Sequence, residues 1–379
     1  MTTNRTDLAV VGAGMIGLAH ARAAAASGKS VVVFERHPFA QGASIRNFGM
    51  IWPIGQPAGR PLELARLSRA RWIEAAQTAG FWLNSCGSIH LAHREDEFQV
   101  LEEFAESAPN RGYNCRLQTA AEVLAKTPAA NPAGLIGGLW SETELAVDPR
   151  EVIRTVPRWL KSEFGVRFEF ARPVSHVESG ELVTADGRVW RADRILIASG
   201  SDLKTLFPEV LASAGLVTSK LQMLRTVPQP AGFKLGPHLA GGLTLRHYQT
   251  FADCPALKSL KDRIARETPA LDRYGIHVMA AQNQRGEITL GDSHEYGEDL
   301  DPFYRQEIEE LILEELRKMI RLEDWTIRER WYGIYAKSPE GLYFEHDPLP
   351  GVKIVTGLGG AGMTLSWGVA DDVWSRWTA

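Results

Sequence analysis

The sequence predicts an α/β protein in which helices flank a parallel sheet and a second domain lies beside it. Its 379 residues are more than one small core usually needs, so roughly two domains are expected, and these need not be contiguous. Residues 7–35 read as a strand, a glycine turn, a helix and a strand, which is the pattern of a parallel α/β unit. Apolar segments at residues 194–200 and 352–357 supply further strands.

Composition and charge argue against several classes of protein. Apolar residues make up 44% and charged residues 23% of the chain, as in an ordinary globular protein. The net charge is -4 with no long run of one sign, which gives no support to a nucleic-acid partner or a polybasic membrane surface. The N-terminus reads as neither a signal peptide nor a membrane span. Cys86, Cys115 and Cys254 form no C-x-x-C pair, so a reduced cytoplasmic protein is expected.

The first glycine-rich loop lies between a short buried strand, residues 7–11, and a helix, residues 15–27. Gly12, Gly14 and Gly17 fit the pattern G-x-G-x-x-G. The first glycine allows the tight turn, the second lets the backbone approach a pyrophosphate, and the third lets the helix pack on the strand. The helix N-terminus adds free amides and the positive end of a dipole. The motif in this context predicts a dinucleotide site.

An acidic residue completes the motif. Glu35 ends the next apolar strand, residues 30–34, and stands 18 residues after Gly17. A carboxylate there can accept hydrogen bonds from ribose hydroxyls, and it would repel a 2′-phosphate, which argues against NADP. The motif alone does not separate NAD from FAD.

A second glycine-rich loop, residues 357–366, lies near the C-terminus, and one ligand with two ends would explain both loops. The loop opens a helix that begins at Gly360, so it places another helix N-terminus against the ligand. A flavin ring gains negative charge along its N1–C2=O edge on reduction, and a helix N-terminus suits that edge. The loop at residues 36–44 and the small residues after the strand at 194–197 also suit a cofactor longer than NAD. FAD is therefore the predicted cofactor.

With these motifs the sequence resembles the D-amino-acid oxidase, glycine oxidase and sarcosine oxidase superfamily of flavoproteins over nearly the whole chain. Three shorter motifs add to the resemblance, namely Gly42-Ala-Ser44, Val147-Asp-Pro149 before a helix, and Ala198-Ser-Gly200. The resemblance implies a Rossmann-like FAD-binding domain and a substrate domain built on an antiparallel sheet. Segments 274–282 and 287–291 have the strand composition that such a sheet needs.

The resemblance also implies domain boundaries and a set of cofactor contacts. Residues 1–85, 145–220 and 325–379 would form the FAD-binding domain, and residues 86–144 and 221–324 the substrate domain. The residues expected to bind FAD are Gly12, Gly14, Met15, Ile16, Gly17, Glu35, Arg36, Ser44, Asn47, Phe48, Val174, Ser199, Gly200, Gly359, Gly360, Gly362, Met363 and Thr364.

Members of this superfamily oxidise amines, in that a hydride leaves the carbon next to an uncharged amine for flavin N5 and the imine then hydrolyses to a carbonyl compound. No dedicated acid–base residue is visible in the sequence. Tyr335 stands where glycine oxidase-like members have the carboxylate-binding arginine of Trp-x-Gly-x-Arg, and Thr364 stands where sarcosine oxidase-like members have a carboxylate-binding lysine. Gly333 occupies the place of the cysteine that attaches flavin in sarcosine oxidases, so non-covalent FAD is expected.

Other cations and hydroxyls could hold a different anion. Lys337 shares a face with Tyr335 if this segment is a strand, and Arg46 lies in the loop after Ser44. Three more candidates are predicted at the end of a substrate-domain strand, namely Arg246, His247 and Tyr248. The phrases at residues 46–52 and 291–297 resemble a subgroup associated with aminophosphonate breakdown. A phosphonate has three acceptor oxygens, which suit several cations and hydroxyls.

The predicted function is FAD-dependent oxidation of a small amine with an anionic group, specifically 2-aminoethylphosphonate or an N-alkyl derivative. A glycine, sarcosine or D-amino-acid oxidase with an altered clamp stays open, as do an NAD-dependent dehydrogenase and a non-catalytic flavin-binding protein. The electron acceptor, the amine class and the oligomeric state also stay open.

No metal site and no hydrolytic site are predicted. His90 and His93 would fall on opposite faces of a strand, residues 292–294 lack the context of a nucleophile elbow, and His277 is expected in the core.

Overall fold

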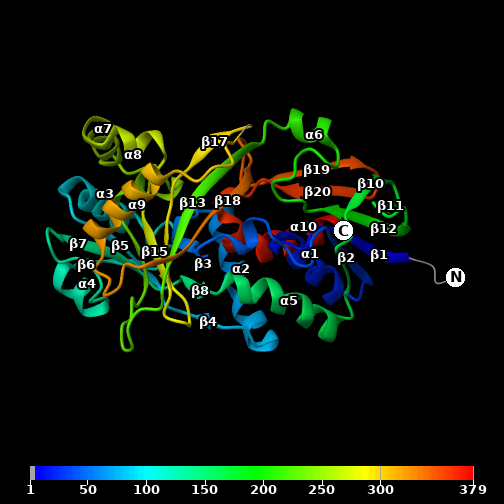
Figure 1. Cartoon of the computed structure of the whole chain (residues 1–379), viewed down its shortest axis with the longest axis horizontal. Helices are drawn as coiled ribbons and strands as arrows, with labels where there is room; N and C mark the ends of the chain where they lie inside the picture. The colour runs from blue at the N-terminus through cyan, green and yellow to red at the C-terminus, as the bar shows by residue number, and fades with distance from the viewer. Residues whose placement is uncertain (1–4, 299, 379) are drawn as a thin grey trace.

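Two large sheets dominate the computed structural model, which describes residues 5–298 and 300–378. Figure 1 shows them side by side. The first combines strands from both ends of the chain with strands at residues 167–197, and the second is built from strands at residues 88–141 and 217–337. The first sheet carries parallel strands and helices, and the second is almost entirely antiparallel. The predicted α/β class, with a Rossmann-like domain and a second domain, is confirmed. Among the helices of the described residues, none combines the length and apolar character needed to cross a membrane.

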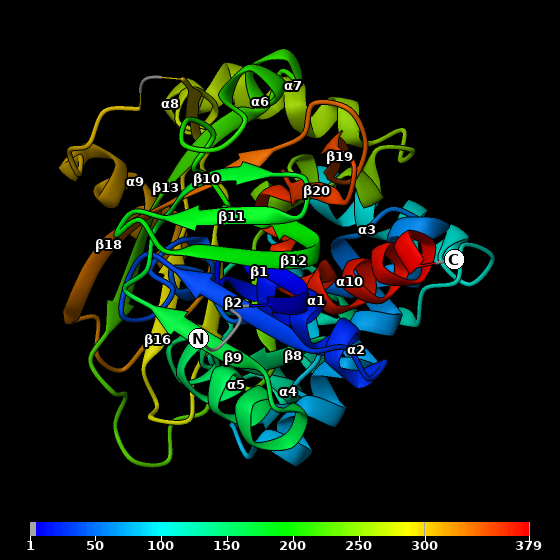
Figure 2. The same cartoon turned by 90° about the vertical axis from the view of Figure 1, so that its right-hand side faces the viewer.

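The first sheet has eight strands in the order β10-β11-β12-β1-β2-β9, and β20 lies beside the second half of β12 with β19 beyond it (Figure 2). β1 is parallel to both β12 and β2. The central strands are runs of Val, Ile and Leu because both of their faces are buried. The strand bounds are β1 (Arg5–Val11), β2 (Val31–Glu35), β9 (Arg167–Phe170), β10 (Val174–Glu178), β11 (Glu181–Thr184), β12 (Val189–Ile197), β19 (Phe344–Leu349) and β20 (Val352–Thr356).

Alternate residues of β1 point into two different cores. Leu8 and Val10 join the core formed with the helices α1, α2, α5 and α10, whereas Ala9 and Val11 join the core formed with the β10–β11 hairpin and α6. α10 packs against both α1 and α2. The helix bounds are α1 (Met15–Ala26), α2 (Arg60–Ala79), α5 (Pro149–Phe164), α6 (Pro208–Ser213) and α10 (Gly362–Thr378).

The second sheet has nine strands in the order β17-β13-β16-β15-β14-β5-β7-β6, with β18 on the other edge of β13. β13 and β18 form a long antiparallel ribbon that pairs Val217 with Lys337 at one end and Thr226 with Ile327 at the other. The strand bounds are β5 (Ser88–Ala92), β6 (Cys115–Thr119), β7 (Gly137–Ser141), β13 (Val217–Thr226), β14 (His238–Ala240), β15 (Met279–Gln282), β16 (Ile288–Gly291), β17 (Glu295–Gly297) and β18 (Ile327–Lys337).

The second sheet buries its own core against five helices and several short elements. A small sheet of β3, β8 and β4 lies between the two large ones (Figure 1). The bounds of these elements are α3 (Glu95–Ser107), α4 (Ala120–Lys126), α7 (Leu257–Glu267), α8 (Pro269–Arg273), α9 (Gln306–Met319), β3 (Met50–Ile51), β4 (Leu83–Asn84), β8 (Leu145–Val147), and the 3-10 helices η1 (Ala43–Ile45), η2 (Pro53–Gly55), η3 (Gly242–Arg246), η4 (Gln249–Phe251) and η5 (Gly359–Ala361).

The domain boundaries stay predictions. The limits at residues 220 and 325 assign β18 to the FAD-binding domain, and in the structure β18 pairs with β13 of the second sheet. Two local predictions are wrong. Only Met279–Gln282 of the strand predicted at 274–282 is extended, since a proline-initiated helix occupies the chain up to Arg273. Arg246 ends a 3-10 helix rather than a strand.

Candidate active site

Two cavities meet at the turn between β1 and α1. The first cavity lies over the ends of β1, β2, β10 and β12, and the second extends from there to the C-terminal loop and the β13–β18 ribbon. Both are lined by Gly14, Ser44, Ala198 and Gly200. One long ligand could therefore occupy both cavities.

The glycines of the first loop have the predicted geometry. Gly12 has φ +108°, and a Cβ on it would lie 2.3 Å from the carbonyl oxygen of Ala198. A Cβ on Gly17 would lie 1.9 Å from the carbonyl oxygen of Gly12, so this glycine packs α1 on the turn and does not line either cavity. A Cβ on Gly14 would lie 3.1 Å from Oγ of Ser44, and it would stand where both cavities need bare backbone.

The acidic residue of the motif lies in the wall of the first cavity. Glu35 is 8% exposed, and its carboxylate accepts hydrogen bonds from the backbone N–H of Ala13 at 3.0 Å and of His37 at 3.1 Å. These bonds fix the carboxylate beside the glycine turn, where a ribose would lie. Next to it Arg36 forms an ion pair with Asp202. Burial would raise the pKa of the Asp202 carboxyl, but the Thr205 hydroxyl and the Arg36 guanidinium outweigh burial and lower this pKa below its usual value.

The other predicted residues of this cavity are also in place. Its wall includes Val174, Ser199 and Gly200. The hydroxyl of Thr356 donates to the carbonyl of Gly200 at 2.7 Å, which ties β20 to the loop after β12. The wall of this cavity is therefore formed by residues 11–44 and 172–206, and β20 supports it from behind.

The C-terminal loop forms one end of the second cavity. Gly357 and Gly359 have φ of +79° and +58°, and α10 begins at Gly362. The same cavity is lined by eight of the other predicted cofactor residues, namely Met15, Ile16, Asn47, Phe48, Gly359, Gly360, Gly362 and Met363. Thr364 instead faces the core, where its hydroxyl accepts the backbone N–H of Trp52 at 2.9 Å.

The loop after η1 is held in place by Asn47. Its side-chain amide donates to the carbonyls of Ala43 and Ser44 at 3.0 and 3.1 Å, and its Oδ1 accepts the N–H of Gly49 at 2.8 Å. The hydroxyl of Ser44 in turn accepts the N–H of Met15 at 2.9 Å. This loop and the start of α1 therefore form one rigid wall.

These residues fit FAD. Two helix N-termini and two glycine loops give free amides and close approach at both ends of the paired cavities, and Glu35 stands at the ribose position. Among the described residues that line the two cavities there is no cysteine, and Gly333 lies against Arg46. A thioether to the flavin therefore has no donor there, which supports the prediction of non-covalent FAD.

The substrate candidates lie unequally around the second cavity. Arg46 lines it and also lines a third, wider cavity that opens beside it. Tyr335 lines the second cavity, and its hydroxyl lies 2.7 Å from Nε2 of His294. Lys337 does share the face of Tyr335 on β18, as predicted, but it is exposed and lies over the ring of Tyr296.

The group at residues 246–248 splits in two. Arg246 is bound to Asp272 and to the carbonyls of Leu271 and Ile276, so its guanidinium holds a loop together. His247 and Tyr248 turn the other way, and the ring of His247 lies 4.0 Å, centroid to centroid, from that of His277.

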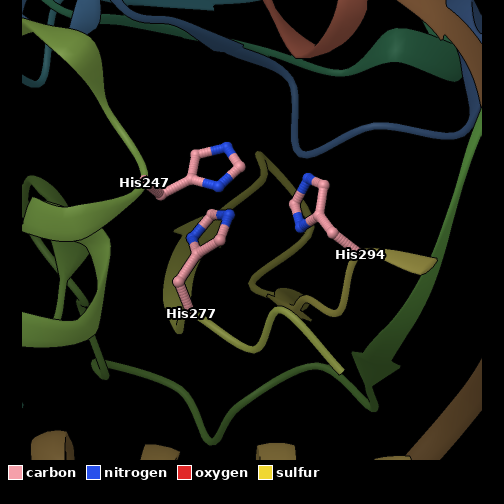
Figure 3. A group of neighbouring side chains, drawn as sticks. All are labelled: His247, His277 and His294. Carbon is pink, nitrogen blue, oxygen red and sulfur yellow. The ribbon is translucent and has the colours of Figure 1, made fainter. Parts of the chain in front are cut away.

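A polar cluster that was not predicted as a group lies at the substrate side. Figure 3 shows its three imidazoles, of His247, His277 and His294, and the carboxyl of Asp292 lies beside those of His277 and His294. Asp292 itself lines the second cavity. A hairpin between the predicted strands at 274–282 and 287–291 would have placed residue 277 opposite 292. The structure shows this pairing, since the two backbones exchange hydrogen bonds of 2.8 and 3.2 Å.

The three imidazoles lie close together, with one nitrogen of each ring within 4.8 Å of the others. Zinc–nitrogen bonds of about 2.0–2.1 Å would place tetrahedral ligand atoms about 3.4 Å apart, so metal content is a property to be measured for this cluster. Burial lowers the pKa of His247 to about 4, and it lowers the pKa values of His277 and His294 well below their ordinary value. The three rings are therefore neutral at pH 7.

A Rossmann-like sheet with a cavity for a long dinucleotide, placed against a second sheet with a polar pocket, defines a dinucleotide-dependent oxidoreductase. The chain belongs to the DAO family of FAD-dependent oxidoreductases, whose family model matches residues 7–375. The predicted class of enzyme and its cofactor FAD are thereby confirmed.

Similar proteins agree with this assignment. One of the subunits of opine oxidase from Agrobacterium tumefaciens (strain Ach5) is 25% identical over 239 residues, which are 58% of this chain and 63% of that protein. The match therefore spans less than two thirds of the length of that relative. Glycine oxidase from Geobacillus kaustophilus has a similar structure, with a TM-score of 0.77 and 20% identity over 99% of this chain and 94% of that one. L-proline dehydrogenase from P. horikoshii gives a TM-score of 0.80 and 19% identity over 99% and 94%.

Proposed function

We propose that the protein oxidises the C–N bond of a small amine that carries an anionic group, with an aminophosphonate as the substrate. The candidates are 2-aminoethylphosphonate and its N-alkyl derivatives. FAD supplies the hydride acceptor when it is bound, and the resulting imine hydrolyses to a carbonyl compound. The chain's own task is to orient the amine and its anion beside the flavin.

The observation that carries the proposal is the pair of residues at the clamp positions. Position 335 holds a tyrosine whose hydroxyl meets His294, and position 364 holds a threonine whose hydroxyl is used in the core. A substrate carboxylate next to the reacting carbon would therefore lack the cationic side chain that binds it in glycine oxidase-like and sarcosine oxidase-like enzymes. Arg46 is the cation left at the edge of the second cavity within the described residues.

The third cavity supports an anionic substrate. Its wall has one acidic residue, Glu151, and five arginines within the described chain, namely Arg46, Arg150, Arg154, Arg285 and Arg330. Three of these are paired, Arg150 with Glu329, Arg285 with Asp148 and Arg330 with Glu309. Arg154 stacks on the ring of Phe39. A cleft with this charge balance favours the approach of anions, and Arg46 connects it to the second cavity.

Anaerobic bleaching of the flavin tests the proposal. The purified enzyme would be mixed with 2-aminoethylphosphonate, its N-methyl form, glycine, sarcosine and D-alanine. For each amine, the rate constant of flavin reduction would be divided by the dissociation constant of that amine. We expect this ratio to be largest for one of the two phosphonates. A larger value for a carboxylate-bearing amine would refute the aminophosphonate assignment.

A glycine, sarcosine or D-amino-acid oxidase is the second candidate. The names of the similar proteins, among them a glycine oxidase and a proline dehydrogenase, favour it. In that case Arg46 or Lys337 would hold the carboxylate. The three free cysteines support the proposal of a reduced cytoplasmic protein.

A further inference from the structure

One carboxyl oxygen of Asp292, Oδ1, is buried beside the second cavity without a hydrogen-bond donor. The residue is 3% exposed, and its Oδ1 has no hydrogen-bond partner. Its backbone is fixed by two hydrogen bonds with His277. A buried carboxyl oxygen without a donor is costly, so a ligand in the cavity that brings an N–H group would complete this site.

The neighbours of Asp292 do not supply a permanent counter-ion. Its Oδ1 lies 3.1 Å from Nε2 of His277 and 3.8 Å from Nδ1 of His294, but neither contact is a hydrogen bond, and the second is too long for one. Nδ1 of His294 and both nitrogens of His277 are also without hydrogen-bond partners. Figure 3 shows the three imidazoles around a common space. The cluster of Asp292 and the three histidines is therefore polar, its imidazole rings are uncharged, and several of its polar atoms lack hydrogen-bond partners.

We propose that Asp292 binds the amino group of the substrate and accepts its proton on Oδ1, while the rings of His277 and His294 lie beside the carboxyl and limit its orientation. This inference rests on the proposed function, because it requires that the substrate be an amine. It makes Asp292 a catalytic residue and the two histidines positioning residues.

The proton transfer prepares the substrate for oxidation. One N–H bond of the ammonium breaks and its electron pair stays on nitrogen, while an O–H bond forms at Oδ1 of Asp292. The uncharged amine can then donate its lone pair as the hydride leaves the neighbouring carbon. No further oxidant or reductant takes part in this step.

Burial brings the proton affinities of the Asp292 carboxyl and of the substrate amino group closer to each other. In water a carboxyl has a pKa of about 4 and an alkylammonium about 10, so the proton would stay on nitrogen. Burial raises the pKa of Asp292 well above its usual range, and the same desolvation disfavours the ammonium form of a bound amine. A base is most effective when its pKa lies near the working pH.

The groups that face Asp292 come from several elements. These are His247 and Tyr248 after η3, His277 before β15, His294 and Tyr296 at β17, and Tyr335 on β18. Burial, and less so the carboxylate of Asp292, raises the pKa values of the tyrosines. Two cations act on the histidines, namely Lys337 on His247 and His294, and Arg246 on His247 and His277. With the tyrosines and histidines neutral, the bound amine is the group that exchanges a proton with Asp292.

The kinetic test compares Asp292→Asn with the wild-type holoenzyme by anaerobic stopped-flow between pH 6.5 and 10. The asparagine keeps the shape but accepts no proton. Since general-base catalysis contributes about 10²–10⁴-fold, we expect flavin reduction in the variant to be about 100–1,000-fold slower at pH 7. Its rate should rise about tenfold per pH unit as the free amine deprotonates, whereas the wild-type rate stays nearly flat. A variant within threefold of the wild type at pH 7, or one that is slower without this rise, would overturn the proposal.

Controls separate this role from a structural one. Asp292→Glu retains a carboxylate and should keep the flat pH profile, and Asp253→Asn, at a side chain that is 82% exposed, should match the wild type. FAD content and melting temperature would be measured for each variant. Asp292→Ser replaces the asparagine variant if that protein loses FAD.

A binding test does not depend on turnover. The trimethylammonium forms of 2-aminoethylphosphonate and glycine carry the charge but can be neither deprotonated nor oxidised, and their binding can be followed by the flavin spectrum. We expect Asp292→Asn to bind the better of the two at least tenfold more weakly. Equal affinity, or no binding to the wild type, would refute the site. If amines do not reduce the flavin although this binding is lost in the variant, the proposed function fails and the cation site stands.

Metal analysis tests whether the three histidines instead bind a metal ion. We expect less than 0.1 equivalent of zinc, iron, cobalt or manganese in the purified holoenzyme. One equivalent that disappears in His277→Ala would overturn the proposal, because these rings would then be ligands of an ion.

Discussion

Replacing Arg46 with alanine should weaken turnover of the preferred anionic amine while FAD stays bound. The side chain lies between the second and third cavities, and one of its guanidinium nitrogens donates to the carbonyl of Tyr332 at 3.1 Å. The remaining N–H groups are available to an anion. The surrounding loop should survive the change, because Trp331 and Ala43 hold the backbone of Arg46 rather than its side chain.

The size of the effect follows from the environment. A hydrogen bond to a charged group in a partly dry site contributes about 1.5–3 kcal/mol, which corresponds to roughly 10–100-fold in kcat/KM. The guanidinium is half-buried, so salt should screen it only in part. Arg46→Lys keeps the charge but loses the two-pronged geometry of the guanidinium, so its kcat/KM should lie between those of the wild type and Arg46→Ala.

Steady-state kinetics on matched substrates would measure the effect. The phosphonate 2-aminoethylphosphonate would be compared with propylamine, which lacks the anion. Arg46→Ala should reduce kcat/KM for the phosphonate by the factor above and change that for propylamine less than threefold. Equal losses on both substrates would show that Arg46 supports the flavin or the loop, and no loss on either would show that it has no part in binding.

Four further outcomes are expected. Gly14→Val should abolish FAD binding, because its side chain would occupy the bare-backbone position shared by the two cavities; normal FAD content in a folded variant would contradict this. Denaturing precipitation should leave all of the flavin absorbance in the supernatant, since no cysteine among the described residues lines the cavities. Tyr335→Arg should shift the ratio of kcat/KM values modestly toward glycine or sarcosine, by restoring a cation beside the reacting carbon, and an unchanged ratio would count against that position as a clamp. Burial lowers the pKa values of His20 and His238 to about 4 and of His90 to about 3. Below pH 6.5 the unfolded chain therefore binds more protons than the folded chain, and the free energy of unfolding decreases as the pH decreases. The loss from pH 7.5 to 5.5 should be about 1.4 kcal/mol for each histidine, and a melting temperature that does not fall over this range would refute it.

The cofactor half of the site could be predicted because its residues act through local geometry. The roles of Gly12, Gly14 and Gly17 follow from their spacing inside one strand–turn–helix unit, and Glu35 follows from its place at the end of the next strand. Thr364 stays a predicted cofactor residue, but its side chain faces the core, because the position of the first residue of α10 decides which side of that helix faces the ligand. A shift of one residue turns a side chain by about 100° around a helix.

The substrate half could not be predicted in this way. Asp292, His277 and His294 lie on loops at the ends of three different strands, and their approach depends on how β15, β16 and β17 pair. Asp292 follows an apolar strand, whereas His277 precedes β15 and His294 precedes β17, and polar residues at strand ends are common. The pairing between residues 277 and 292 becomes visible only when the hairpin register is known.

The assembly of the first sheet from distant segments has a consequence during synthesis. The second half of β12, Ile195–Ile197, pairs with β20, Val352–Ile354, so on the ribosome this edge stays without a partner while about 150 further residues are made. Unpaired strand edges favour association with other chains. The loop that closes the flavin site follows directly after β20, so a nascent chain cannot capture FAD until nearly all of it has emerged. A shortage of FAD would therefore affect chains whose first sheet is already complete. Slow elongation would instead prolong the state in which the edge of β12 has no partner.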